Sequence, residues 1–161
     1  MIPKYDVVVL QEQIRRTGRS LLQYATESIP WSRKPEDRAI FEKILEMAKD
    51  EQVHIQDITK YLRENRQIVP HMGAHPMHFM NMNFLAVKRL VDLIIQHHQA
   101  EVAHLETVNA DVTTPEVKDL LERLAVSKRK HIQQLQEWLA PPAPQADDDD
   151  TQITTPSGIQ E

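Results

Sequence analysis

The sequence predicts an all-α protein, a bundle of four helices with one long crossover between the second and third helices. Apolar residues recur at helical spacing in four stretches, and short or proline-containing segments separate these stretches. The chain of 161 residues is 40% hydrophobic and contains only 3 Gly, a composition that suits helices packed around a core. At this length we expect a single domain.

Composition also excludes several classes of protein. The net charge is −5 and the basic residues are interspersed with acidic ones, so we expect no nucleic-acid partner. The chain has no cysteine, which rules out disulfides and thiolate metal ligands. No apolar run approaches the roughly 18 residues that a membrane span needs. The first residues, MIPKYDVVVL, lack the pattern of a signal peptide, so the sequence predicts a cytoplasmic protein with no membrane contact.

The first helix is predicted over residues 7–27, with Asp6 as its N-cap. Thr17 and Gly18 lie in or beside its apolar stripe, which is formed by Leu10, Ile14, Leu21 and Tyr24. The segment SIPWSRKP at 28–35 breaks this pattern. Pro35, followed by two acidic residues, then starts the second helix, which is predicted to run to about Asn65.

Residues 67–81 form the predicted crossover. They include two of the ten prolines and show no helical period. A dozen extended residues reach about 40 Å, which is enough to return along a 30-residue helix. The second and third helices are therefore expected to run parallel, although an up-down-up-down arrangement stays open.

The third helix is predicted over about 83–109 and the fourth over 115–139. Between them, Thr114-Pro115-Glu116 has the residues of an N-cap, a first helical position and an acidic first turn. After Ala140 the chain becomes rich in proline and carries four consecutive Asp. We therefore expect a bundle over residues 1–139 and a disordered tail over 140–161, either solubilising or a recognition tag.

Three of these helices direct ionisable residues inward. On the second helix, Glu51 lies at the centre of the apolar face and His54 lies about one turn further on, near its edge. The third helix places His98 and Glu101 inward, and the fourth places Lys128 and His131 inward. A buried carboxylate is costly unless it is paired, protonated or bound to a cation, so this cluster is the candidate site. Counting from the turn between the last two helices puts His98 and Lys128 at similar depth.

The same stretches carry a resemblance to a known family. EKILEMAKDEQVHIQDITKYL resembles the second helix of the ferritin-like superfamily, which includes bacterioferritins and rubrerythrins. SKRKHIQQLQEWL resembles the fourth helix and LLQY the end of the first. The resemblance covers residues 7–139 and implies a ferritin-like four-helix bundle, a metal-binding function and a homo-oligomer, at least a dimer.

Carried over position by position, the family's di-iron ligands are only partly present. Glu51 and His54 match the Glu-x-x-His motif of the second helix, and His131 matches the histidine of the fourth. Lys128 stands where the family has a glutamate, and Thr17 stands at the position of the first-helix glutamate. On the third helix the equivalent level is Ile94 or Ile95, so that His98 and Glu101 lie one to two turns later.

Three interpretations of this site remain open. In the first, Glu51, His54, His98, Glu101 and His131 supply ligands for a single transition metal, Fe, Zn or Cu, without efficient ferroxidase activity or iron storage. In the second, the ammonium of Lys128 replaces the metal and pairs with Glu51, leaving a metal-free structural or interaction module. The third is a working di-metal centre. The sequence assigns no catalytic residue.

A separate group of metal-ligating side chains lies in the crossover. Seven of the twelve residues from 71 to 82 are Met or His, namely His71, Met72, His75, Met77, His78, Met80 and Met82. Thioethers and imidazoles together suit Cu(I). Methionine also fills gaps where a crossover packs on helices. Both copper handling and plain packing are therefore kept as hypotheses.

Overall fold

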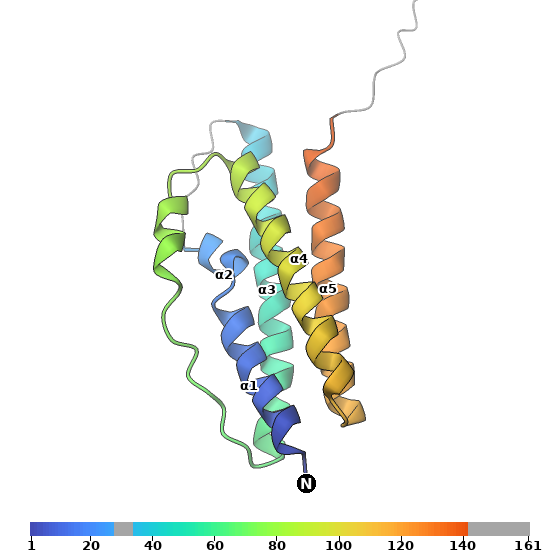
Figure 1. Cartoon of the computed structure of the whole chain (residues 1–161). Coiled ribbons are helices and arrows are strands. Elements are labelled where there is room, and N and C mark those ends of the chain that lie inside the picture. Colours follow the sequence, from blue (N-terminus) through green and yellow to red (C-terminus); the bar gives the residue numbers. More distant parts are fainter. Residues whose placement is uncertain (28–33, 142–161) are drawn as a thin grey trace, which may run out of the picture.

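The computed structural model describes residues 1–27 and 34–141, which contain five α-helices and one 3-10 helix and form a helical bundle (Figure 1). The helices are α1 (Lys4–Gly18), α2 (Leu21–Ala25), α3 (Pro35–Glu64), α4 (Val87–Asp111) and α5 (Pro115–Leu139). The 3-10 helix η1 (Met77–Met82) lies between α3 and α4. Residues 28–33 of the predicted break and residues 142–161 of the predicted tail lie outside the described residues.

The order and direction of the long helices follow from their connections. α3 and α4 run in the same direction, because the chain between them returns along the outside of α1 and α2 before α4 begins (Figure 1). α1 and α5 run in the opposite direction. α4 packs on α5, and α3 packs on both α1 and α5. Pro35 and Pro115 each occupy a first helical position, as predicted, since proline lacks the backbone donor that is unused there.

The first predicted helix is divided in two. α1 ends at Gly18, and the separate helix α2 begins at Leu21. Ser20 adopts an extended backbone conformation and its hydroxyl accepts a hydrogen bond from the backbone N–H of Gln23, at 3.2 Å, which makes it the N-cap of α2. The prediction of one continuous helix over residues 7–27 was wrong, because the apolar period continues through the break.

The sequence predicted Asp6 as the N-cap of its own helix, and this prediction was wrong. Asp6 instead binds the start of α5. Its carboxylate accepts hydrogen bonds from the backbone N–H groups of Thr113 and Thr114, at 3.4 and 2.9 Å, and from the hydroxyl of Thr114. Thr114 is the N-cap residue of α5 by backbone position, but its side chain makes no cap hydrogen bond. Asp6, which exposes no surface, therefore satisfies donors at the N-terminus of a helix more than 100 residues away.

Two apolar clusters fill the bundle. The first is formed by α2, the first half of α3, η1, the first half of α4 and the end of α5, and includes Leu21, Ile44, Phe79, Leu90 and Leu135. The second is formed by α1, the ends of α3 and α4 and the first half of α5, and includes Leu10, Ile58, Leu105 and Leu121. Their side chains are almost completely buried.

A polar layer separates the two clusters. Glu51 on α3 lies between Ala48 of the first cluster and Ile58 of the second. The same boundary falls at His98 on α4 and at Lys128 on α5. We use the name polar layer for Ser20, Gln23, Glu51, His98, Lys128 and His131. The bundle thus interrupts its apolar interior at one level, where α3, α4 and α5 each contribute an ionisable side chain.

The crossover is attached to the bundle at several points. The Gln11 side chain donates to the carbonyl of Ile68, at 2.8 Å, and the Tyr24 hydroxyl donates to the Asn83 side chain, at 2.7 Å. The Met72 side chain occupies the space beside Gly18 so closely that a Cβ at Gly18 would lie 2.1 Å from its sulfur. Within the described residues, no helix is both long and apolar enough to cross a membrane.

Candidate functional site

Glu51 is the centre of the polar layer, and both of its carboxylate oxygens have partners. The ammonium of Lys128 donates to Oε1. The hydroxyl of Ser20 and the side-chain amide of Gln23 donate to Oε2, at 2.9 and 3.2 Å. Neither Glu51 nor Lys128 exposes any surface. The sequence predicted this pairing as the metal-free alternative.

The surroundings of Glu51 favour its charged form. Burial by itself raises the pKa of the carboxyl, but the charge and hydrogen bond of Lys128, with further contributions from His98 and Gln23, bring the pKa down from 4.5 to about 2. Glu51 is therefore a carboxylate at neutral pH, and its negative charge is balanced by the ammonium beside it. The pair satisfies two charges that the apolar interior could not otherwise hold.

His98 lies next to this pair without a hydrogen bond. It exposes no surface, and neither ring nitrogen has a hydrogen-bonding partner. Its Nε2 atom lies 3.8 Å from Oε1 of Glu51, beyond hydrogen-bonding distance. Burial, followed by the nearby Lys128 charge, lowers the pKa of His98 from 6.5 to about 3, so the imidazole is neutral. His98 and Lys128 meet at the same level, in agreement with the count from the turn.

His131 connects the polar layer to the surface. Its ring lies 5.7 Å from that of His98, measured between centroids, and its Nε2 atom is 3.0 Å from Oδ2 of Asp50. The hydroxyl of Ser127 donates to the same Asp50 oxygen, at 2.6 Å. Burial lowers the pKa of His131. Asp50 is half-exposed, and with His131 it lines a cleft of about 560 Å³ between α3 and α5, together with Lys43, Lys130, Glu137 and Trp138 among others.

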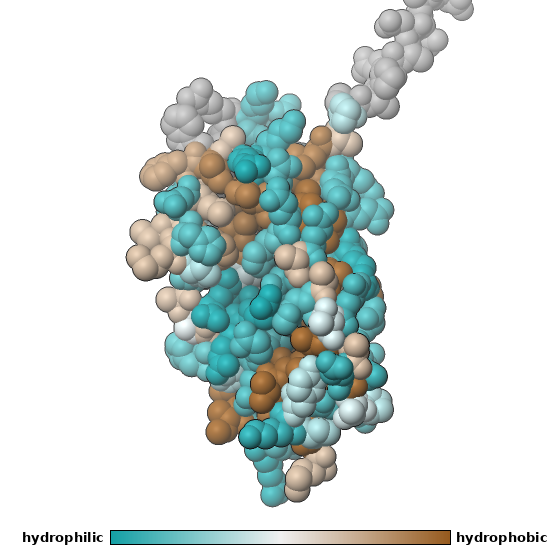
Figure 2. All heavy atoms as spheres, in the orientation of Figure 1, coloured by the Kyte–Doolittle hydropathy of each residue, from teal (hydrophilic) through white to brown (hydrophobic). Residues whose placement is uncertain are grey.

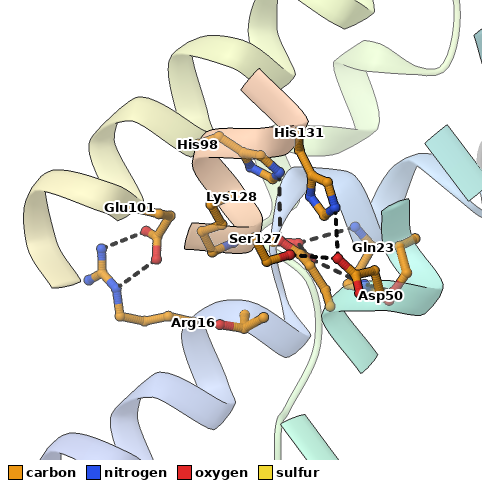
Figure 3. A network of polar contacts seen from close by, with 12 residues as sticks. Arg16, Gln23, Asp50, His98, Glu101, Ser127, Lys128 and His131 are labelled. Carbon is orange, nitrogen blue, oxygen red and sulfur yellow. Dashed lines mark hydrogen bonds and ion pairs between the residues drawn. The ribbon is translucent and has the colours of Figure 1, made fainter. Parts of the chain in front are cut away.

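Glu101 points inward as predicted, but its partner is an arginine. Arg16 on α1 donates to both carboxylate oxygens, at 2.7 and 3.3 Å, so the contact is bidentate. Figure 3 shows this pair to one side of Lys128, with Asp50 and Ser127 on the other side. The Glu101 carboxylate therefore forms an ion pair between α4 and α1.

His54, the other expected ligand of α3, lies outside the polar layer. It is partly exposed, and the charges that act on it most strongly belong to Asp50, Arg123 and Asp57 rather than to Glu51. Burial lowers its pKa. The structure therefore brings Glu51, Lys128, His98 and His131 together and leaves His54 and Glu101 aside. One turn along α3 rotates His54 from the central face to its edge.

Three residues that contact Glu51 or His131 were not predicted from the sequence, namely Ser20, Gln23 and Asp50. Ser20 reaches Glu51 from the break between α1 and α2, and Gln23 reaches it from α2. Thr17 accepts a hydrogen bond from Gln13 instead. Asp50 was missed because it lies one position from the central face of α3. Its signal was the pair of adjacent acids, Asp50 and Glu51, of which only one could be central.

The residues present do not fit the di-iron centre that the ferritin-like resemblance implies. Such a centre needs several free carboxylates, yet the oxygens of Glu51 are engaged by Lys128, Ser20 and Gln23, and those of Glu101 are engaged by Arg16. The Lys128 ammonium would also repel a divalent ion. Within residues 1–27 and 34–141, no group of three or more His, Asp, Glu or Cys side chains is arranged to hold a metal ion.

No protein-family model, curated protein or solved structure matches the chain. The likeness to ferritin-like proteins consequently rests on the motifs of the sequence alone. The helical bundle itself stands independently of that likeness.

Proposed function

We propose that this protein is a ferritin-like bundle in which an internal ion pair takes the place of the di-metal centre, and that it acts as an interaction module through its surface. The observation that carries the proposal is the contact of Lys128 with Glu51 inside the bundle, where neither side chain reaches solvent. A homo-oligomer and a cytoplasmic location are parts of the same proposal.

The electrostatics of the polar layer support a metal-free interior. An ammonium and a carboxylate in direct contact neutralise one another, and Ser20 and Gln23 complete the hydrogen bonding of the carboxylate. A divalent ion at Glu51 would have to displace Lys128, whose charge would then be buried without a partner. Removing the partner of a buried charge is strongly unfavourable.

A single metal at His98 and His131 is the second candidate function. Both ring nitrogens of His98 and the Nδ1 atom of His131 are buried without hydrogen-bonding partners, and imidazole nitrogen is a common ligand for zinc, copper and iron. The ammonium of Lys128 opposes it, because Lys128 contacts the Glu51 oxygen that faces His98.

Elemental analysis separates the two candidates. The untagged protein is purified, incubated with Fe(II) or with Zn(II), freed of excess metal and assayed for metal per chain. If the interior is metal-free, neither wild type nor a His98→Gln/His131→Gln variant should retain iron or zinc. Retention of about one equivalent by wild type, lost in that variant, would overturn the first candidate and establish the second.

A further inference from the structure

The 3-10 helix η1 presents two methionines to solvent on one face. Met77 and Met80 expose 83% and 59% of their surface, whereas Phe79 between them exposes only 3%. In a 3-10 helix, side chains three residues apart eclipse each other. The thioethers of Met77 and Met80 therefore lie side by side outside the bundle. Figure 2 shows pale-brown apolar groups among hydrophilic ones at the left edge of the molecule, where η1 lies.

Packing does not account for these two side chains. Methionine usually fills gaps between buried groups, as Met47 and Met82 do in the first apolar cluster. In η1 the buried side chain is Phe79 rather than Met77 or Met80, and its ring lies 5.5 Å from that of Tyr24. Two long apolar side chains next to each other in solvent forgo the free energy of burial, and both thioethers are free to bind a ligand.

We propose that Met77 and Met80 bind a soft monovalent cation, Cu(I), with His78 as the third ligand. Thioethers select Cu(I) over harder ions, and imidazole complements them. His78 is exposed and lies between the two methionines in the chain, with its ring against that of Phe79 at 4.6 Å. Residues 65–86 contain no Asp or Glu, so the crossover itself offers no carboxylate to Ca²⁺, Mg²⁺ or Mn²⁺.

The crossover holds the backbone of η1 in place before any ion arrives. Phe79 anchors η1 in the first apolar cluster, and Tyr24 binds Asn83 directly after η1. A site whose ligands are already positioned loses less conformational entropy on binding. The proposed site uses none of the residues of the polar layer, so it does not depend on the proposal that the interior is metal-free.

Of the seven Met and His residues of the crossover, the structure leaves Met77, His78 and Met80 as candidate ligands. Met82 packs against the first apolar cluster, and Met72 fills the space beside Gly18. The imidazole of His71 accepts a hydrogen bond from the backbone N–H of Gly73, at 2.9 Å, and His75 packs against Tyr24. Each of these four is engaged with the protein itself.

The test is an anaerobic competition for Cu(I) between the full-length protein and a chromogenic Cu(I) chelator. Wild type should take up one equivalent. The Met77→Leu/Met80→Leu variant keeps the shape of both side chains but removes both sulfurs, and should bind at least about tenfold more weakly. The matched control is Met72→Leu, which removes a thioether of the same crossover outside the proposed site and should bind as wild type. His78→Asn should weaken binding in the same direction as the double variant.

Failure of wild type to compete with the chelator would overturn the proposal, and so would wild-type affinity in the double variant. Equal loss in Met72→Leu would overturn the assignment of the site. Circular dichroism and size-exclusion chromatography of each variant verify that fold and oligomeric state are unchanged. If the double variant alters the oligomeric state, the exposed methionines belong to an interface between copies, and the copper site is rejected. Because the His98→Gln/His131→Gln variant tests the interior, the two proposals fail independently.

Discussion

Lys128 and Glu51 form an ion pair from which solvent is completely excluded, at the level where the two apolar clusters of the bundle meet. The pair crosses from α5 to α3, and Ser20 extends it to the segment between α1 and α2. Three parts of the chain are therefore joined through one carboxylate. Such a junction specifies how the helices align, while its net contribution to stability depends on the desolvation of both charges.

The first prediction concerns removal of one partner. Lys128→Met leaves the Glu51 carboxylate buried without its counter-charge and should lower the free energy of unfolding by about 3–5 kcal/mol. Glu51→Met leaves the ammonium unpaired and should cost a similar amount. Urea denaturation of the two variants and wild type measures both effects.

The double variant Glu51→Met/Lys128→Met is the matched control, and it should be about as stable as wild type or more stable. Ser20 and Gln23 lose Glu51 as an acceptor in this variant, but each keeps another hydrogen bond. The Ser20 hydroxyl accepts from the backbone N–H of Gln23, and the Gln23 side-chain amide donates to the carbonyl of Ala48. If the losses of the two single variants simply add in the double variant, the two residues are not coupled and this account of the polar layer is wrong.

Helical spacing was sufficient to find the inward residues of α3, α4 and α5. Glu51, His98, Lys128 and His131 were all recognised from their faces, because each lies on a long and regular helix. Partners that depend on tertiary contacts were not recognised. Arg16 neutralises Glu101 from a helix 85 residues away, and nothing in the local pattern of either helix indicates that contact.

The break after Gly18 shows the same limit. The apolar stripe continues from Ile14 to Leu21 as if one helix ran through, and the Ser20 hydroxyl that caps α2 also binds Glu51 on another helix. Local capping and a distant carboxylate thus act on the same atom. The copper hypothesis, by contrast, came from composition alone. Met77 and Met80 are distinguished from the other methionines of the crossover by their greater exposure and by the packing of Met72 beside Gly18 and of Met82 against the first apolar cluster.

The second prediction concerns a carboxylate in place of the Lys128 ammonium. Lys128→Glu creates Glu-x-x-His on α5 and places a second carboxylate against Glu51. Without metal, this repulsion should lower the melting temperature by about 10 °C or more. With Fe(II) or Zn(II) added, the variant should recover stability, because two facing carboxylates with His131 now suit a cation.

Lys128→Met provides the control for that experiment. It also removes the ammonium but adds no carboxylate, so its melting temperature should respond less to metal than that of Lys128→Glu. An unchanged melting temperature of Lys128→Glu in both conditions would contradict the position of Lys128 inside the polar layer.

The third prediction is a loss of stability in acid through Glu51. The pKa of its carboxyl is lowered from 4.5 to about 2 in the folded protein, so the unfolded chain binds the proton first as the pH falls. The free energy of unfolding should therefore decrease with falling pH across this window, and the contribution should be complete above the ordinary pKa. Urea denaturation at a series of pH values measures the slope. Glu51→Gln should show a shallower slope, and equal slopes in the two proteins would refute the prediction.

The fourth prediction concerns His98 and a higher pH window. Burial, followed by the nearby charge of Lys128, lowers its pKa from 6.5 to about 3, so the imidazole is neutral in the folded protein. The unfolded chain therefore gains this proton before the folded protein does, and stability should fall as the pH drops below about 6.5. His98→Gln cannot titrate, so its stability should depend less on pH below 6.5 than that of wild type, while the loss through Glu51 below pH 4.5 remains. A wild-type profile that stays flat between pH 6.5 and 4.5 would show that His98 is not held neutral by the fold.

The last prediction tests the contact of Asp6 with the start of α5. Asp6→Ala removes the acceptor for the backbone donors of Thr113 and Thr114, and leaving such partly buried donors unsatisfied costs about 1–3 kcal/mol. Asp111→Ala, an exposed carboxylate at the end of α4, is the matched control and should change stability by less than about 0.5 kcal/mol. Hydrogen exchange distinguishes a local cap from a general effect, because the amide of Thr114 should exchange faster in Asp6→Ala even at equal global stability. If that amide keeps its protection, Asp6 does not hold the N-terminus of α5, and the link between the first and last helices must lie elsewhere.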